Sequence, residues 1–416
     1  MIRRHISDAV LKALADNPVV LLHGARQTGK STLAQWIATE EHPARYLTLD
    51  DAGVLAAAQG DPAGFLAGLE TPVVLDEVQR APELFLALKA SVDRDRRPGR
   101  FLLTGSADVM LLPSLSESLA GRMEVLTLWP LSQGETEGVK EGFIDALFSD
   151  ALASKMKIQQ NISALLDRVF RGGFPVVHSR ASEERRRAWF GSYVTTILQR
   201  DVRDLANING LTQLPRLLSL MAARATSLLN LSELSRSIAI PQTTLKRYLA
   251  LLETTFLART LPAWSGNLGK RLVKAPKLVL SDTGLISYLL GLNRARLGSD
   301  TNLLGPLLEN FTIMELEKQL VWSRAQPRLF HLRTQTGQEV DIVLEDSAGH
   351  LVGIEVKAGT TVNSRDFKGL RAFAEMSGRR FRRGVVLYTG TECIPFGPRL
   401  HAVPISALWS INAKRQ

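Results

Sequence analysis

Short apolar runs along the first part of the chain end abruptly in small or charged residues. Val19–Leu22 leads into a glycine-rich segment and then a helical pattern, Val73–Leu75 leads into an Asp-Glu pair, and Phe101–Leu103 leads into Thr-Gly-Ser. Strands that are buried on both faces read as continuous apolar runs, and parallel strands deliver their following residues to one edge of the sheet. The pattern predicts an α/β fold with a parallel sheet in residues 1–135.

The middle of the chain has a helical pattern instead. Residues 136–205 indicate packed helices, and a short helix over Ser232–Ile238 is followed by a turn and by a second helix that Pro241 opens and that reaches Leu252. The segment Phe256–Pro262 can then form a two-stranded wing, so residues 206–300 are predicted to be a winged-helix domain. Such a domain binds DNA in some proteins and docks on proteins in others, and the pattern favours neither.

Apolar and polar residues alternate in residues 338–345 and 351–357, which predicts a β-hairpin around Ser347–Gly349. A turn that is symmetric about Ala348 places Asp341 opposite Glu355. One face of the hairpin is predicted to carry Val340, Ile342, Leu344, Val352, Ile354 and Val356. The other face is predicted to carry Glu339, Asp341, Glu355 and Lys357.

Composition narrows the class of protein. The 416 residues suggest several domains, and the single cysteine, Cys393, excludes an intrachain disulfide and fits a reducing compartment. We find no signal-peptide core and no apolar run long enough to span a membrane, so we expect a cytoplasmic protein without a membrane partner. The net charge is +10, and the regions 1–205, 206–300 and 301–416 contribute −2, +8 and +4. The basic middle suits nucleic acid, although a solvated basic face has the same composition.

The segment after the first apolar run matches the pattern GxxxxGKS between a strand and a helix. In this pattern backbone N–H groups surround phosphate oxygens, Lys30 reaches the β- and γ-phosphates, and the Ser31 hydroxyl binds Mg²⁺. The sequence therefore predicts ATP and Mg²⁺ as cofactors. The predicted nucleotide-binding residues are Gly24, Ala25, Arg26, Gln27, Thr28, Gly29, Lys30, Ser31 and Thr32.

Two further strand ends supply candidate catalytic groups. Asp76 is expected to hold Mg²⁺ through water, and Glu77 to polarise the attacking water. Thr104 or Ser106 would orient that water or contact the γ-phosphate. A helix over Leu115–Ala120 and a strand over Val125–Leu128 are expected to follow.

These motifs resemble those of the bacterial AAA+ ATPases that carry a DUF4143 C-terminal region. The resemblance spans nearly the whole chain and implies a P-loop core with a parallel sheet, a helical lid and assembly into a homo-oligomer. The motifs that carry it are Gly24–Ser31, Val73–Glu77, Leu103–Ser106, Ser118–Arg122, Pro130–Ser132, Gly172–Pro175, Tyr193–Val202 and Asp282–Leu285.

The resemblance also assigns roles to arginines. Arg122, at a helix end before the fifth strand, corresponds to the arginine finger that completes a neighbouring subunit's site. An arginine that caps its own helix is the alternative. Arg171 or Arg168, just before Gly172, is the candidate lid contact to phosphate.

The C-terminal hairpin resembles the core of PD-(D/E)xK nucleases. Asp341, Glu355 and Lys357 match the motif, Glu309 matches the acidic residue of the preceding helix, and a valine stands where the motif has proline. The resemblance implies a second Mg²⁺ or Mn²⁺ bound by these residues. In the alternative, Lys357 only bridges the carboxylates of an inactive domain that is used for binding.

The sequence thus predicts four regions: an ATPase core (1–135), a helical lid (136–205), a winged helix (206–300) and a nuclease-like domain (301–416). The first hypothesis is an ATPase that couples nucleotide state to a C-terminal half bound to nucleic acid, DNA rather than RNA. The alternative is a nucleotide-gated switch whose C-terminal half binds a protein partner and cleaves nothing.

Overall fold

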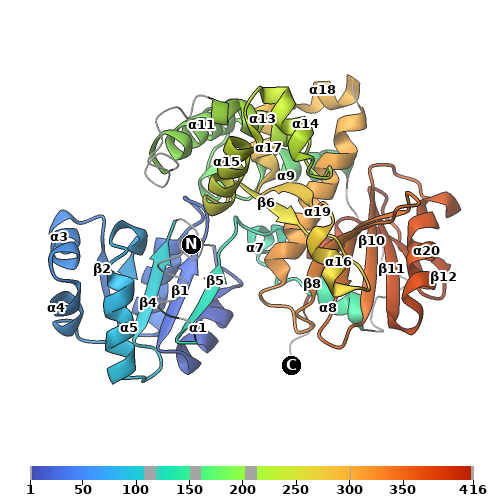
Figure 1. Cartoon of the computed structure of the whole chain (residues 1–416). Helices are drawn as coiled ribbons and strands as arrows, with labels where there is room; N and C mark the ends of the chain where they lie inside the picture. The colour runs from blue at the N-terminus through green and yellow to red at the C-terminus, as the bar shows by residue number, and fades with distance from the viewer. Residues whose placement is uncertain are drawn as a thin grey trace.

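The computed structural model describes residues 2–106, 119, 121–149, 161–201, 213–299 and 301–413. Its N-terminal part is the predicted parallel sheet, with strand order β2-β3-β4-β1-β5 (Figure 1). The strands are β1 (Val19–His23), β2 (Arg45–Thr48), β3 (Val73–Asp76), β4 (Phe101–Gly105) and β5 (Met123–Thr127). The helices are α1 (Ser7–Asp16), α2 (Lys30–Trp36), α3 (Ala52–Gly60), α4 (Pro62–Ala67) and α5 (Leu84–Arg94), and a wider turn, η1 (Ile37–Glu41), extends α2.

Successive side chains of β1 point to opposite faces of this sheet, and helices cover both faces. Val19 and Leu21 pack with α4 and α5, whereas Val20 and Leu22 pack with α1 and α2. Each of these side chains is fully buried. A strand that lies between two layers of helices has no face in water, so its sequence is a continuous apolar run. The predicted fold class is confirmed here. The helix predicted for residues 115–120 lies, apart from Leu119, outside the described residues.

The middle of the chain is helical, as predicted. Its helices are α7 (Gln133–Glu137), α8 (Phe143–Phe148), α9 (Ile162–Arg171), α10 (Pro175–His178), α11 (Glu183–Thr196), α13 (Leu214–Ala223), α14 (Leu231–Ile238), α15 (Gln242–Thr254), α16 (Leu268–Val273), α17 (Thr283–Leu290) and α18 (Arg294–Ser299). Helices α14 and α15 form the predicted helix-turn-helix, and the turn passes through Ala239 in the left-handed conformation.

The predicted two-stranded wing is wrong in its second strand. Strand β6 (Ala258–Leu261) pairs in antiparallel fashion with β7 (Lys277–Leu280), and α16 lies between them in the sequence. The segment Phe256–Pro262 is too short to hold two strands and a turn, so the partner strand has to come from further along the chain.

The C-terminal part is a mixed sheet with the order β12-β13-β11-β10-β9-β8. Helix α19 (Leu304–Gln319) packs on one face and α20 (Lys368–Ser377) on the other, as Figure 1 shows. The strands are β8 (Arg328–Arg333), β9 (Glu339–Glu345), β10 (Leu351–Lys357), β11 (Phe381–Tyr388), β12 (Ile394–Gly397) and β13 (Leu400–Pro404), and α21 (Ala407–Ser410) follows.

The predicted hairpin forms with the predicted register, since Ile342 pairs with Ile354 and Leu344 with Val352. The predicted position of Val340 is wrong. Its side chain packs with Val343 and Leu351 on the α20 side rather than with Ile342. The pairing of β8 with β9 shifts between Phe330 and Leu332, so β9 has one extra residue there and the alternation reverses.

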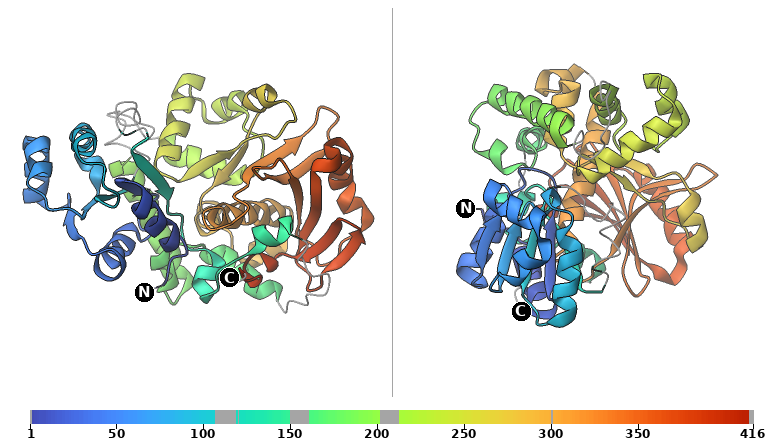
Figure 2. Two further views of the ribbon diagram at one scale, coloured as in Figure 1. Left: turned by 90° about the horizontal axis from the view of Figure 1, so that it is seen from below. Right: turned by 60° about the vertical axis from the view of Figure 1, so that its left-hand side comes forward.

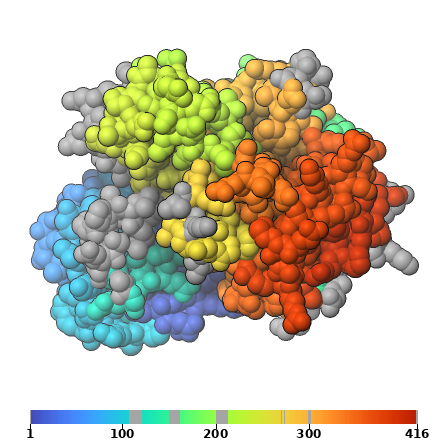
Figure 3. Space-filling model, turned by 45° about the vertical axis from the view of Figure 1, so that its right-hand side comes forward, coloured from blue at the N-terminus to red at the C-terminus, as the bar shows by residue number. Residues whose placement is uncertain are grey.

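The five-stranded and the six-stranded sheets lie at opposite ends of the molecule, and the helical middle of the chain lies between them (Figures 1 and 2). In Figure 3 the yellow segment that leads from α15 to β7 lies between the upper helices and the C-terminal domain. Helix α8, at the start of the region predicted as a lid, packs on β11 and α21. That contact joins it to the C-terminal domain rather than to the N-terminal sheet.

Candidate functional site

The glycine-rich loop connects the end of β1 to the start of α2 at the carboxyl edge of the parallel sheet. Gly24 and Gly29 have φ values of 150° and 93°. A Cβ atom on Gly24 would lie 2.3 Å from the carbonyl oxygen of Leu128, so only glycine fits there. The Lys30 ammonium is buried and donates to the carbonyl oxygens of Gly24 (3.0 Å) and Ala25 (2.9 Å).

The other predicted nucleotide-binding residues differ in their contacts. Thr28 donates from its hydroxyl to the Ala25 carbonyl oxygen at 2.9 Å, which closes the loop. The Tyr193 hydroxyl on α11 donates to the carbonyl oxygen of Arg26 at 3.4 Å. Gln27 has a left-handed backbone, and Thr32 is exposed on α2.

Asp76 lies at the end of β3 beside the loop. Its Oδ1 atom is 3.1 Å from the Ser31 hydroxyl and also accepts a hydrogen bond from Thr104. Its Oδ2 atom accepts from the Tyr46 hydroxyl at 2.6 Å. The pKa of Tyr46 is raised, first by burial and then by its bond to Asp76. Tyr46 lies outside the motifs, on the neighbouring strand β2, and the sequence carried no signal that it reaches this carboxylate.

Glu77 follows β3 in a left-handed conformation, with a φ of 61° that residues other than glycine rarely adopt. Both of its carboxylate oxygens lie 3.0 Å from the Ser106 hydroxyl, and Gln79 donates to one of them. Thr104 accepts from the Glu77 N–H at 3.3 Å. Thr104 thus contacts Asp76, and Ser106 contacts Glu77, so the two hydroxyls hold different carboxylates.

The structure places Arg122 away from this loop. Arg122 precedes β5, whose first residue pairs with Val19 at the amino end of β1, whereas the loop follows the carboxyl end. Its guanidinium donates to Asp93 on α5 at 2.7 Å. Within its own chain Arg122 is therefore separated from the loop by the length of a strand.

The arginines of the Gly172 motif lie at the junction with the C-terminal half. Arg168 donates to Gln133 at 3.2 Å and stacks over Trp409 at 5.2 Å. The Arg171 carbonyl oxygen faces Gly284, and the charge of Arg171 contributes to lowering the pKa of His178, which burial lowers most. A phosphate contact by either arginine stays a prediction.

A buried arginine that sequence reasoning missed connects the loop to the middle of the chain. Arg4 donates to the Thr28 carbonyl oxygen (2.6 Å), the Trp129 carbonyl oxygen (2.7 Å) and the Glu135 carboxylate (3.1 Å). Burial alone would raise the pKa of Glu135, but Arg4 holds it below its ordinary value. Glu135 also closes a capping box with Ser132, and the S-x-x-E pattern is a signal that the sequence did contain.

This connection continues to α19. The Gln133 N–H donates to Glu315 at 2.9 Å, and Lys318 donates to Glu315 (2.6 Å) and to the Leu131 carbonyl oxygen (3.0 Å). The Gly173 N–H donates to the buried Asp282 at 2.7 Å. Three of the motifs that carry the resemblance therefore meet at this junction: Pro130–Ser132, Gly172–Pro175 and Asp282–Leu285.

The four residues predicted for a nuclease-like site do come together, from the first half of α19, the start of β9 and the end of β10. The Val356 N–H donates to Asp341 at 2.9 Å, and Lys357 donates to Glu355 at 3.0 Å. Burial and the charge of Asp341 raise the pKa values of both Glu309 and Glu355.

An unpredicted residue occupies this cluster. The ammonium of Lys277, on β7, lies 2.7 Å from Glu309, 3.1 Å from Glu339 and 3.5 Å from Asp341. Within the ranges that the structure describes, no group of three or more His, Cys, Asp and Glu side chains is arranged to hold a metal ion. The predicted second metal is therefore not supported.

The cluster should make stability depend on pH. Burial and the charge of Asp341 raise the pKa of Glu355 from 4.5 to about 8. A raised pKa stabilises the folded state at low pH, and this contribution is lost as the pH rises from about 4.5 to about 8. Glu355→Gln removes the titration, so its free energy of unfolding should rise relative to the wild type over this range, by up to about 1.4 kcal/mol per pH unit.

Urea unfolding at pH 5, 6.5 and 8 measures this difference. Glu375→Gln, at an exposed position on α20, is the matched control and should track the wild type. A Glu355→Gln difference that does not change with pH would contradict the raised pKa.

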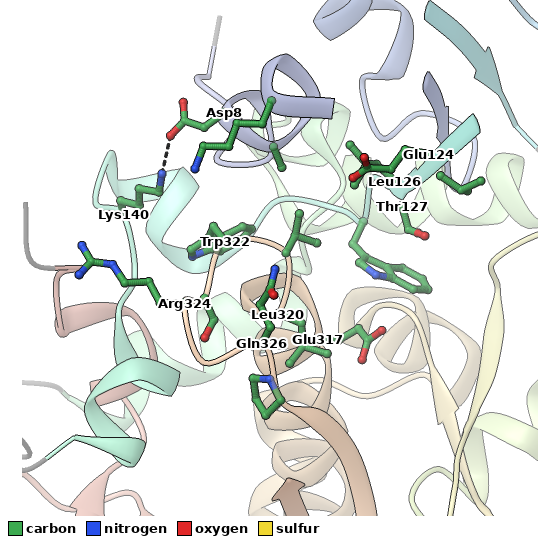
Figure 4. Close-up of a pocket in the computed structure, with 17 residues that line it drawn as sticks. Asp8, Glu124, Leu126, Thr127, Lys140, Glu317, Leu320, Trp322, Arg324 and Gln326 are labelled. Carbon is green, nitrogen blue, oxygen red and sulfur yellow. Dashed lines mark hydrogen bonds and ion pairs between the residues drawn. The ribbon is translucent and has the colours of Figure 1, made fainter. Parts of the chain in front are cut away.

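A separate cavity of about 640 Å³ lies between the edge strand β5, α1 and the turn after α19 (Figure 4). In Figure 4 Asp8 pairs with Lys140 at one end, and Glu124, Leu126 and Thr127 line the other. The cavity contains charges of both signs and none of the loop or Asp76–Glu77 residues. We assign it no role in nucleotide chemistry.

Three family models match successive parts of the chain. The model of an AAA domain matches residues 16–137, a domain of unknown function, DUF8612, matches residues 162–296, and another, DUF4143, matches residues 304–408. The middle model spans parts of both predicted regions between the core and the C-terminal domain, whose boundaries stay predictions. None of the described helices is long and apolar enough to cross a membrane.

Two curated relatives resemble nearly the whole chain. The uncharacterized proteins Mb2031c of Mycobacterium bovis and Rv2008c of Mycobacterium tuberculosis are each 33% identical over 406 residues, which is 97% of this chain and 83% of theirs. Solved structures resemble it weakly. The Thermotoga maritima RuvB Holliday junction branch migration motor is 20% identical, with a TM-score of 0.30 over 63% of this chain and 90% of its own. AMPPCP-bound DnaA from Aquifex aeolicus is 16% identical, with a TM-score of 0.25 over 60% of this chain and 86% of its own. Such low scores do not establish a common fold.

Proposed function

This chain belongs to the family of bacterial proteins that join an AAA domain to a DUF4143 domain, and on that premise we propose that it binds and hydrolyses ATP with Mg²⁺. The observation that carries the proposal is the contact of Ser31 with Asp76 at 3.1 Å, at the same edge of the sheet as the glycine-rich loop and the Lys30 ammonium bonded to it. The loop, a magnesium ligand pair and a second carboxylate at one sheet edge are the groups that phosphoryl transfer needs.

Each residue has a separate role in this proposal. Lys30 exchanges its bonds to the loop carbonyls for bonds to phosphate oxygens, and Ser31 and Asp76 hold Mg²⁺. Held by Ser31 and Asp76, Mg²⁺ would supply positive charge that offsets the charge of the phosphate oxygens. Glu77 accepts the proton of the water that attacks the γ-phosphorus, while Thr104 and Ser106 fix the two carboxylates.

We further propose that the nucleotide state reaches the C-terminal half through Arg4. Its guanidinium bonds both to the loop, through Thr28, and to Glu135 at the start of α7. Because α7 bonds in turn to Glu315 on α19, a shift of the loop on nucleotide binding would displace groups on which the C-terminal sheet is packed.

Arg122 supports a homo-oligomer as the working form. It lies at the sheet edge opposite its own loop, so a role as an arginine finger would require the site of a neighbouring copy and the release of its bond to Asp93. We keep the cytoplasm as the proposed location.

Nucleic acid, DNA rather than RNA, is the first candidate partner of the C-terminal half. Gln242, Thr243, Lys246 and Arg247 are exposed on α15, the second helix of the helix-turn-helix, where a recognition helix would present them to the major groove. A protein partner is the second candidate. The ion pairs of Lys277 favour a C-terminal domain that binds without cleaving, as that alternative requires.

The test is the ATPase rate with and without duplex DNA or RNA, together with binding of a fluorescent ATP analogue. Lys30→Ala should weaken nucleotide binding by about 100-fold because charge-assisted contacts to phosphate are lost. Lys12→Ala, at an exposed position on α1, is the control.

The outcomes separate the proposals. Unchanged nucleotide binding by Lys30→Ala would refute the ATP site. ATP turnover that DNA stimulates would support the nucleic-acid partner. Turnover that neither nucleic acid changes would favour the protein partner.

A further inference from the structure

The carboxylate cluster of the C-terminal domain already contains a cation. Four acidic side chains surround it: Glu309 on α19, Glu339 and Asp341 on β9, and Glu355 on β10. The Lys277 ammonium lies within 3.5 Å of three of them, and its side chain is only 2% exposed. Burial alone would lower the pKa of Lys277, but the charges of Glu309 and Asp341 outweigh it and raise the pKa above its ordinary value.

Lys277 and Lys357 have different positions in the cluster. Lys357 bonds to Glu355 and is about one-third exposed, so it lies at the rim. Lys277 bonds to Glu309 and Asp341, the two acids that the nuclease motif would use together with Glu355 for a divalent ion. A metal at that position needs direct oxygen ligands and cannot share them with an ammonium in the same space.

We infer that the Lys277 ammonium is the resident cation of this cluster and that it excludes a divalent metal from the position that the PD-(D/E)xK motif would assign to one. The carboxylates are then neutralised from inside the chain. Metal-dependent strand cleavage by this domain is not expected. The inference rests on the contacts of Lys277 and does not depend on ATP hydrolysis.

The ion pairs of Lys277 also connect two regions of the chain. Strand β7 belongs to the two-stranded sheet of the middle region, whereas the carboxylates belong to the C-terminal domain. Thr226, in a left-handed conformation before α14, also bonds to Glu309. The cluster therefore stabilises the contact between the middle region and the C-terminal domain. A substitution that removes the Lys277 ammonium from the carboxylates also weakens this contact.

Binding of Mn²⁺ to the nucleotide-free full-length protein, followed by electron paramagnetic resonance, tests the inference. The wild type should show no Mn²⁺ binding that depends on Asp341, as judged against Asp341→Asn. Lys277→Met should bind Mn²⁺ at least about tenfold more tightly than the wild type because a positive charge beside the carboxylates is removed. Adding Asp341→Asn to Lys277→Met should abolish the gain.

Two control variants keep the outcome interpretable. Lys274→Met removes a nearby ammonium that bonds to the Arg333 carbonyl oxygen instead, and it should behave as the wild type. Lys277→Arg keeps a cation and should not gain Mn²⁺ binding. Wild-type Mn²⁺ binding that is lost in Asp341→Asn would overturn the inference, as would a folded Lys277→Met that gains none. If Lys277→Met does not fold, the comparison of wild type with Asp341→Asn still decides.

Discussion

Replacing Glu77 with glutamine is expected to lower the ATP turnover of this protein by about 100-fold or more, while ATP binding changes little. Glutamine is nearly isosteric but cannot accept the proton of the attacking water. The side chain is held in place, since the Ser106 hydroxyl lies 3.0 Å from both carboxylate oxygens and Gln79 donates to one. The left-handed backbone at Glu77 fits a functional position, because such strain persists only where the surroundings enforce it.

Steady-state phosphate release measures the loss of turnover, and a fluorescent ATP analogue measures binding. Glu83→Gln is the matched control, because this glutamate lies on the same segment, just before α5, and is exposed. Should Glu77→Gln keep wild-type turnover, Glu77 would not be the base. Should it lose binding as well, Glu77 would act on the ground state, and the separate roles proposed for Lys30 and Glu77 would fail.

The second large effect is expected at Arg4, although it lies outside every motif. Arg4→Gln should lower the free energy of unfolding by about 3–5 kcal/mol, because the buried Glu135 carboxylate would lose its paired charge. The same substitution frees the Thr28 carbonyl oxygen in the glycine-rich loop. We therefore also expect weaker ATP binding, measured under conditions in which the variant is folded.

Arg3→Gln provides the control, because the neighbouring Arg3 side chain is 78% exposed and that of Arg4 only 8%. Removing both charges in Arg4→Gln with Glu135→Gln should recover part of the lost stability, since no unpaired charge is then buried. Arg3→Gln and Arg4→Gln variants of equal stability would contradict this account. So would a double variant whose loss is the sum of the two single losses.

Some parts of the fold could be predicted from the sequence because they depend on residues that are close together along the chain. The apolar runs predicted β1, β3 and β4, and Pro241 predicted the start of α15 to within a residue. The hairpin register followed from the alternation on both sides of Ala348. The bulge that turns Val340 to the other face was not readable, because it depends on how β9 pairs with the more distant β8.

In both candidate sites, the residues that are close in the sequence were predictable and the partners from distant segments were not. The sequence by itself determined the glycine-rich loop and the Asp76–Glu77 pair, because a phosphate-binding turn needs particular residues at short, regular spacings. It also determined that Asp341, Glu355 and Lys357 belong together, since they lie on one hairpin, whereas Glu309 joined them only through the resemblance to the PD-(D/E)xK core.

Only the tertiary structure decided which further groups reach these sites. Tyr46 bonds to Asp76 from another strand, Arg4 bonds to Glu135 across 131 positions, and Lys277 bonds to Asp341 across 64. A lone lysine or arginine in the sequence carries no mark of its partner, because the attraction between buried charges depends on distance in space and on exclusion of water. The meaning of the carboxylate cluster therefore changed once the fold placed the Lys277 ammonium inside it.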